Sequence, residues 1–142
     1  MNVRMILAAA AFAAAGVSAP VLAAPASAPH AAACVAALKA QEAGLAESVK
    51  AGEPREPVLL KVVRSGIAII GTQYLAGLRE AEARALLAAA EEDFKALPRS
   101  SAEERQAECL REGDALYKGA SGLERSLITS AAQRRIRRLA GA

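Results

Sequence analysis

The sequence predicts an all-α fold, a compact bundle of four to five helices stapled by one disulfide. Two observations predict the helices. Apolar residues recur about every 3.6 residues, and short segments with proline or glycine separate these periodic stretches. A third observation predicts the disulfide. The two cysteines, Cys34 and Cys109, follow a segment that is typical of exported chains, in which cysteines are usually paired. Short connections between helices favour a compact bundle.

Residues 1–23 have the features of a cleaved signal peptide. Arg4 supplies the positive charge, an uncharged alanine-rich stretch follows, and the small residues up to Ala23 suit a signal peptidase. Pro20 interrupts the apolar run, which is shorter than the roughly 20 residues of a spanning helix. Lipidation is disfavoured because Cys34 lies well beyond that run. We therefore expect a periplasmic or secreted protein, cleaved near Ala23.

Charge and composition restrict the partners and the core. The chain has 18 Lys and Arg against 15 Asp and Glu, and the signal peptide contains one of the 18. This even balance does not indicate a nucleic-acid partner. Hydrophobic residues make up 54% of the chain and aromatic residues only 3%, so alanine and aliphatic side chains must form the core.

The sequence divides into a flexible leader, residues 24–30, and a single helical domain, residues 31–142. The first helix is predicted over about 31–51, and a proline-rich linker follows over 52–57. Residues 58–70 are rich in β-branched side chains, but their polar residues form one narrow helical stripe that we expect to be solvated. That stripe consists of Lys61, Arg64, Ser65, Ala68 and Thr72.

The second half of the chain carries the strongest helical periodicity. A helix is predicted over about 73–97, either continuous with 58–70 or separated from it near Gly71. Glycines at 66, 71 and 77 would admit a closely packed neighbouring helix. Ser101 and Ser121, each followed three residues later by glutamate, predict capping boxes for two further helices, the last ending near Leu139.

The cysteines are expected to form a structural disulfide that closes a loop of about 75 residues and stabilises the fold by roughly 4 kcal/mol. His30 is the only histidine, and its place in the leader predicts a solvated linker residue rather than a metal ligand or general base. Because the cysteines are paired and no second imidazole exists, no metal or cofactor is predicted. The sequence also shows no nucleophile motif or phosphate-binding loop, so we expect no catalysis.

The last helix carries an unusual number of arginines. Ile128, Ala132, Ile136 and Leu139 share one side of it, and Arg134, Arg135, Arg137 and Arg138 project elsewhere. Some of these charges complement the helix dipole, so the arginines are either a solvated face or an interaction surface.

Two functional classes remain. The first is a protein-binding or structural module whose partner is another envelope protein. The alternative is a surface or chaperone-like protein whose basic helix contacts anionic lipid head groups, as a peripheral membrane contact, or unfolded clients. Small-residue faces would also serve the seam of a homodimer.

Overall fold

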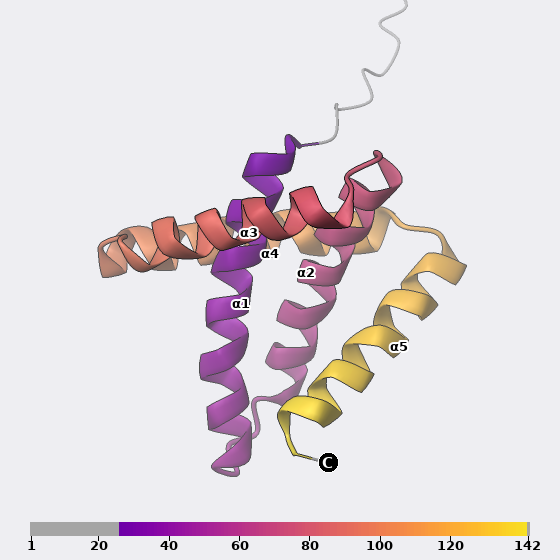
Figure 1. Ribbon diagram of the computed structural model, residues 1–142. Helices are drawn as coiled ribbons and strands as arrows, with labels where there is room; N and C mark the ends of the chain where they lie inside the picture. Colours follow the sequence, from indigo (N-terminus) through magenta and orange to yellow (C-terminus); the bar gives the residue numbers. More distant parts are fainter. Residues whose placement is uncertain (1–25, 142) are drawn as a thin grey trace, which may run out of the picture.

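The computed structural model describes residues 26–141, and over that range the chain forms five α-helices and no strand (Figure 1). The predicted signal peptide lies outside the described residues. The helices are α1 (Ala28–Lys50), α2 (Glu56–Leu75), α3 (Glu80–Lys95), α4 (Arg99–Gly119) and α5 (Gly122–Leu139). A disulfide joins Cys34 to Cys109, so the predicted all-α fold with one staple is confirmed.

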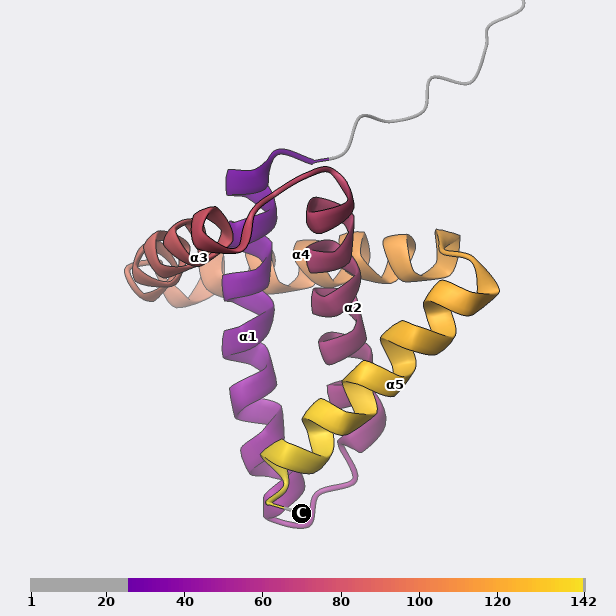
Figure 2. The ribbon, with the colours of Figure 1, turned by 45° about the vertical axis from the view of Figure 1, so that its right-hand side comes forward.

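The fold is built around an antiparallel pair, α1 and α2. Helices α3 and α4 cross this pair on opposite sides, so that α1 passes between them and they scarcely contact each other (Figure 1). Helix α5 runs back along α2 and brings the C-terminus close to the turn between α1 and α2 (Figure 2). Helix α2 packs extensively against α1, α4 and α5 and is therefore the central helix of the fold.

The core lies between α1 and α2 and is completed by single turns of α4 and α5. Its largest fully buried apolar side chains, Leu59, Ile69 and Val62, all come from α2. Helix α1 contributes mainly small residues, including Ala37 at 0% exposure, which lets neighbouring helices approach closely. Helix α3 has no buried residue, so it covers the core only with half-buried side chains.

Helix α1 begins earlier than the predicted boundary at residue 31. Ser27 is its N-cap and accepts a hydrogen bond from the His30 backbone N–H at 3.3 Å, and Pro29 lies in the first turn. The end of the expected flexible leader is therefore helical from Ala28 onward.

The segment 58–97 forms two helices, but the break is not at Gly71. Helix α2 continues through Thr72, whose hydroxyl donates to the Ala68 carbonyl at 3.0 Å, and ends at Leu75. The chain turns at Gly77, whose φ of 98° lies in the left-handed region that favours glycine. The single helix predicted over 73–97 is therefore wrong, and Leu75 is 83% exposed.

The polar stripe of α2 is an interface and not a solvated edge. Ser65 is fully buried against α4, and a Cβ added to Gly113 would lie 2.6 Å from the Ser65 Cβ. The close helix contact thus depends on Gly113, while the three glycines of the 58–77 segment have no such neighbour within 4 Å. The sequence prediction failed here because the partner of the stripe lies about 50 residues away on another helix.

One of the two predicted capping boxes is present. Ser121 accepts from the Glu124 backbone N–H at 3.2 Å and donates its own N–H to the Glu124 carboxylate at 2.7 Å, which lowers the pKa of Glu124. The box predicted at Ser101 is wrong, because α4 already begins at Arg99 and has Pro98 as its N-cap.

Candidate functional site

The disulfide joins the second turn of α1 to the middle of α4. The S–S distance is 2.08 Å and the Cα atoms are 5.1 Å apart. Both half-cystines are buried, with Cys34 at 1% and Cys109 at 2% exposure. The predicted pairing of the cysteines is confirmed.

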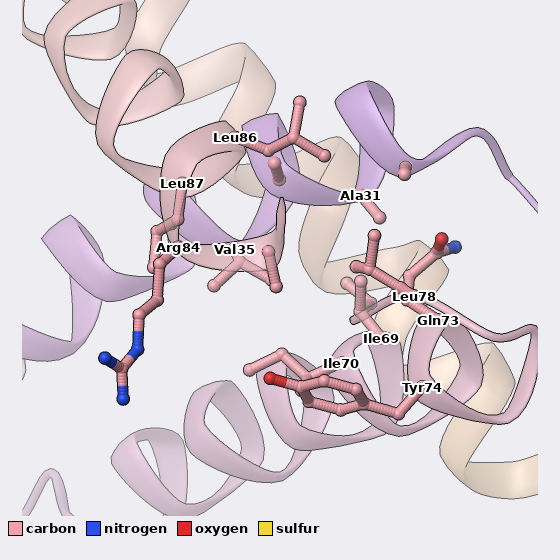
Figure 3. Close-up of a pocket in the computed structure, with 13 residues that line it drawn as sticks. Ala31, Val35, Ile69, Ile70, Gln73, Tyr74, Leu78, Arg84, Leu86 and Leu87 are labelled. Atoms are coloured by element: carbon pink, nitrogen blue, oxygen red, sulfur yellow. The ribbon is translucent and has the colours of Figure 1, made fainter. Parts of the chain in front are cut away.

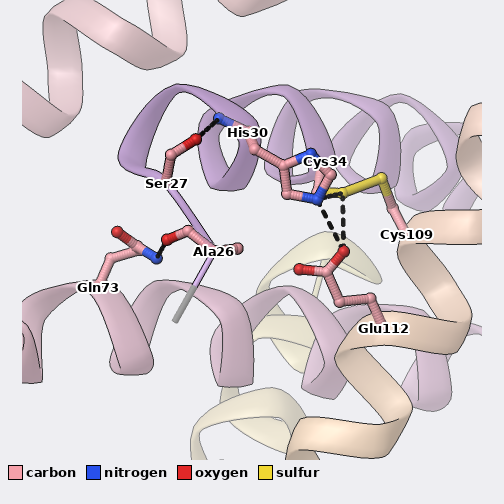
Figure 4. Close-up of polar contacts among 7 residues, drawn as sticks. All are labelled: Ala26, Ser27, His30, Cys34, Gln73, Cys109 and Glu112. Atoms are coloured by element: carbon pink, nitrogen blue, oxygen red, sulfur yellow. Dashed lines mark hydrogen bonds and ion pairs between the residues drawn. A yellow bond between two sulfur atoms is a disulfide. The ribbon is translucent and has the colours of Figure 1, made fainter. Parts of the chain in front are cut away.

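His30 and Glu112 lie beside this disulfide (Figure 4). His30 Nε2 is 2.8 Å from Glu112 Oε2 and 3.8 Å from Cys34 Sγ, while that sulfur is 3.9 Å from the same Glu112 oxygen. His30 is exposed, as predicted, but it is not a linker residue, because the early start of α1 places it in that helix one turn before Cys34. The four-residue spacing from His30 to Cys34 was the signal in the sequence.

An apolar hollow of about 130 Å³ lies between α1, α2 and α3 (Figure 3). A second hollow of about 220 Å³ continues along α1 and α2 toward α5 and shares Val35, Ile70 and Leu87 with the first. We call the two together the seam groove. Its lining is mostly aliphatic and includes Val35, Leu38, Val62, Ile67, Ile69, Ile70, Leu78, Leu86 and Leu87, with alanines of α1.

Polar groups also line the seam groove, and in the second hollow they are Lys39 and the Glu42–Arg135 ion pair. Gln73 donates its side-chain N–H to the Ala26 carbonyl at 2.8 Å, so it holds the start of the described chain against α2 (Figure 4). The Tyr74 ring lies next to Ile70, and the Arg84 guanidinium points away from the apolar cluster, where it pairs with Glu80 (Figure 3). The sequence did not indicate this groove, because its walls come from α1, α2 and α3, with Arg135 of α5 at one end.

The four arginines of α5 have different environments. Arg135 donates from Nε to both Glu42 carboxylate oxygens at 2.9 Å and from Nη2 at 2.8 Å, and Glu42 is only 7% exposed. Arg135 is therefore a structural residue that ties α5 to α1. Arg134, Arg137 and Arg138 are exposed and take part in no ion pair among residues 26–141.

A buried aspartate organises the contact between α2 and α4. Asp114 receives a hydrogen bond from Lys118 at 2.6 Å and pairs with Lys61 at 3.6 Å and Arg64 at 3.4 Å. Lys118, followed by Lys61 and Arg64, lowers the pKa of Asp114 against the opposing effect of burial. The Arg64 guanidinium also lies 4.4 Å from the centre of the Tyr117 ring.

Comparisons with protein-family models, with curated proteins and with solved structures gave no match to this chain. By length and composition alone, α2 would also qualify as a membrane-spanning helix, although much of it is buried inside this fold. Function is therefore inferred from the geometry of the chain itself.

Proposed function

We propose that this chain is an exported, non-catalytic protein-binding module, and that its seam groove holds an apolar segment of another envelope protein. The observation that carries the proposal is the continuity of the groove, which remains open along α1 and α2 between α3 and α5. Apolar grooves with polar edges are typical of protein-protein interaction sites.

Exposure and charge support this choice of partner. Ile70 is 38% and Tyr74 46% exposed, so large apolar side chains at the groove remain available. At the α5 end, Arg138 lies one helical turn beyond the groove residue Arg135 and has no acidic partner among the described residues. The complementary partner is an apolar segment that carries acidic residues on one side.

The chemistry of the titratable groups supports a role without catalysis. The two carboxylates whose pKa is lowered, Asp114 and Glu124, have structural partners at a helix interface and in a capping box. The disulfide supports export, because such bonds persist in oxidising compartments.

The test compares two positions on the same helix with similar exposure. Ile70→Glu places a carboxylate in the groove, whereas Val58→Glu changes a residue that is 41% exposed and does not line it. We expect Ile70→Glu to weaken partner binding at least 10-fold, about 1.4 kcal/mol, and Val58→Glu to leave it unchanged. A photo-crosslinking residue at position 70, but not at 58, should capture the same partner in the native envelope.

Three outcomes contradict the proposal. Equal crosslinking from both positions would place the partner elsewhere, and unchanged affinity of the Ile70→Glu variant would exclude the groove. Capture of a second copy of this chain from position 70 would replace the envelope partner with a homodimer.

One observation favours the alternative role at a lipid surface. Leu123 and Leu127, which are 73% and 61% exposed, continue on α5 into the stripe that carries Arg134 and Arg138. A helix face with leucines and arginines suits the interface of an anionic membrane. This alternative predicts binding to phosphatidylglycerol vesicles at low ionic strength that high salt and Leu127→Gln each abolish, while Ile70→Glu leaves it unchanged. Absence of binding at low ionic strength would exclude it.

A further inference from the structure

The donor atoms of three side chains, His30, Cys34 and Glu112, lie within 4.8 Å of one another where α1 meets α4, and Cys109 is joined to this group through its disulfide to Cys34 (Figure 4). His30 and Cys34 come from successive turns of α1, and Cys109 and Glu112 from successive turns of α4. In the oxidised chain both sulfurs are committed to the disulfide. The chain is synthesised as a dithiol, however, and in that form both sulfurs are free to ligate.

We propose that the dithiol form of this chain binds a zinc ion at this corner, with His30 Nε2, Cys34 Sγ, Cys109 Sγ and a Glu112 oxygen as ligands. Imidazole, thiolate and carboxylate are the ligands that zinc takes in proteins, and four of them make a closed structural site. The site does not depend on the seam groove, which lies on other surfaces of the helices.

Among His30, Cys34 and Glu112, the distances between donor atoms approach those of a tetrahedral site. With Zn–S near 2.3 Å and Zn–N or Zn–O near 2.1 Å, neighbouring ligand atoms lie about 3.4 to 3.8 Å apart, and the two sulfurs have the longest separation. The Cys34 sulfur is 3.8 Å from His30 Nε2 and 3.9 Å from Glu112 Oε2, and the nitrogen and oxygen are 2.8 Å apart. Shifts of roughly half an ångström would bring these three donor atoms into place. The Cys109 sulfur, 2.08 Å from the Cys34 sulfur in the disulfide, would move to roughly 3.8 Å from it once the S–S bond is open.

Burial also fits a site that a metal can enter. The sulfurs lie in the core, but the side chains of His30 and Glu112 are 47% and 29% exposed and form the outer side of the corner. An ion can approach from that side while the thiolates stay away from bulk water. Zinc binding would displace the two thiol protons and join α1 to α4 at the same place as the disulfide. The two crosslinks exclude each other, because each uses both sulfurs.

The experiment titrates Co²⁺, as a spectroscopic substitute for Zn²⁺, into the full mature chain reduced with a phosphine. We expect saturation at one equivalent, thiolate-to-cobalt charge-transfer absorption, the intense visible bands of four-coordinate cobalt, and loss of these bands when Zn²⁺ is added. The oxidised protein should show none of them. Absence of charge-transfer absorption, or the same spectrum from the oxidised protein, would overturn the proposal.

Variants test the two ligands that are not cysteines. His30→Ala and Glu112→Gln should each weaken Co²⁺ binding by at least about 10-fold, since even loss of a group that only supports a ligand costs 10–100-fold. The matched control is Glu108→Gln, an exposed acid one turn earlier on α4. Equal affinity of wild type and His30→Ala would reduce the site to an adventitious dithiol chelate and refute the four-ligand assignment.

Helix content must be followed by circular dichroism in the same titration, because reduction removes a crosslink. If the reduced chain stays folded, the cobalt absorption spectra alone test the proposal. If it unfolds, Zn²⁺ should restore the helix signal of wild type but not of His30→Ala, since binding and folding are then coupled. Failure of Zn²⁺ to restore the wild-type signal would overturn the proposal equally.

Discussion

Individual residues determine how closely α4 can cross α2. At Gly113 an added Cβ would lie 2.6 Å from the Ser65 Cβ and 2.7 Å from its carbonyl oxygen. The atoms that would have to move are backbone and a fully buried side chain, so the contact cannot relax locally.

We therefore expect Gly113→Ala to destabilise the protein by about 1–3 kcal/mol, despite the better helix propensity of alanine. Gly44→Ala is the matched control, because Gly44 is an exposed residue inside α1 with nothing within 4 Å of an added Cβ. It should stabilise by about 0.5–1 kcal/mol. Urea denaturation measures the free energy of unfolding of both variants. A gain in stability for Gly113→Ala would contradict the close crossing of α2 and α4.

Asp114 gives the protein a specific dependence on acid. Its pKa is lowered in the folded state, mainly by Lys118, so its stabilising contribution is present above the unfolded-state pKa of about 3.9. The contribution is lost as the pH falls through the folded-state value. We expect Asp114→Asn to lower Tm near pH 7 and the difference from wild type to shrink toward pH 2, as measured by thermal circular dichroism at constant ionic strength.

Asp93→Asn, at an exposed position of α3, is the control and should change Tm little at either pH. A difference between wild type and Asp114→Asn that is the same at both pH values would show that the carboxylate charge does not stabilise the contact between α2 and α4.

The sequence predicted the disulfide but not the polar partners of individual residues. Two cysteines in a chain that is expected to be exported leave one intramolecular pairing, so predicting the bond between Cys34 and Cys109 required no knowledge of the fold. Lys118 is four residues from Asp114 on the same helix, but Arg64, the partner of Asp114 on α2, and Arg135, the partner of Glu42, lie 50 and 93 residues away. Local spacing carries no information about these two distant partners. The corner at His30 was missed because the helix boundary was placed three residues too late.

At the scale of elements, periodicity identified the helices but not their burial. Helix α3 lies in the segment with the strongest periodic signal and has no buried residue, whereas α2 is the central helix. An apolar stripe indicates which face turns inward, but the extent of its coverage depends on how many neighbours pack there. The turn at Gly77 was missed because Gly71 offered an equally plausible interruption in the sequence.

The attachment of α5 depends on one ion pair in addition to its apolar face. Arg135→Ala would leave Glu42 largely buried without its partner, and we expect a loss of roughly 2–4 kcal/mol. Arg134→Ala, one residue earlier, removes an exposed charge without an ion pair among the described residues and should change stability by less than about 0.5 kcal/mol. Chemical denaturation of both variants checks this, and equal effects would show that the pair is dispensable.

At the scale of the whole molecule, the disulfide closes a loop of 75 residues. The purified protein should have an intact mass about 2 Da below its reduced value, with negligible free-thiol labelling before reduction. Cys34→Ser combined with Cys109→Ser should lower the free energy of unfolding by roughly 4 kcal/mol on the chain-entropy model, a large share of typical domain stability. Full labelling of both cysteines in the untreated protein would contradict the crosslink.

The fold class and the disulfide could be predicted from the sequence, but which helices pack against each other could not. Helix lengths and short turns favour a bundle, but many arrangements satisfy them. The observed one depends on Gly113, on the small residues of α1 and on the buried polar pairs, all of which act between distant segments.

The position of α1 between α3 and α4 has a consequence for biosynthesis. Helix α1 is the first of the described helices to be synthesised, and α3 and α4, which cover part of its alanine-rich surface, are made only after α2. That part stays unprotected until most of the chain exists. A polypeptide that terminates before residue 99 would expose part of that surface permanently. Such truncated products should be substrates for proteases and for chaperones that hold unfolded chains, whereas the full-length protein escapes both.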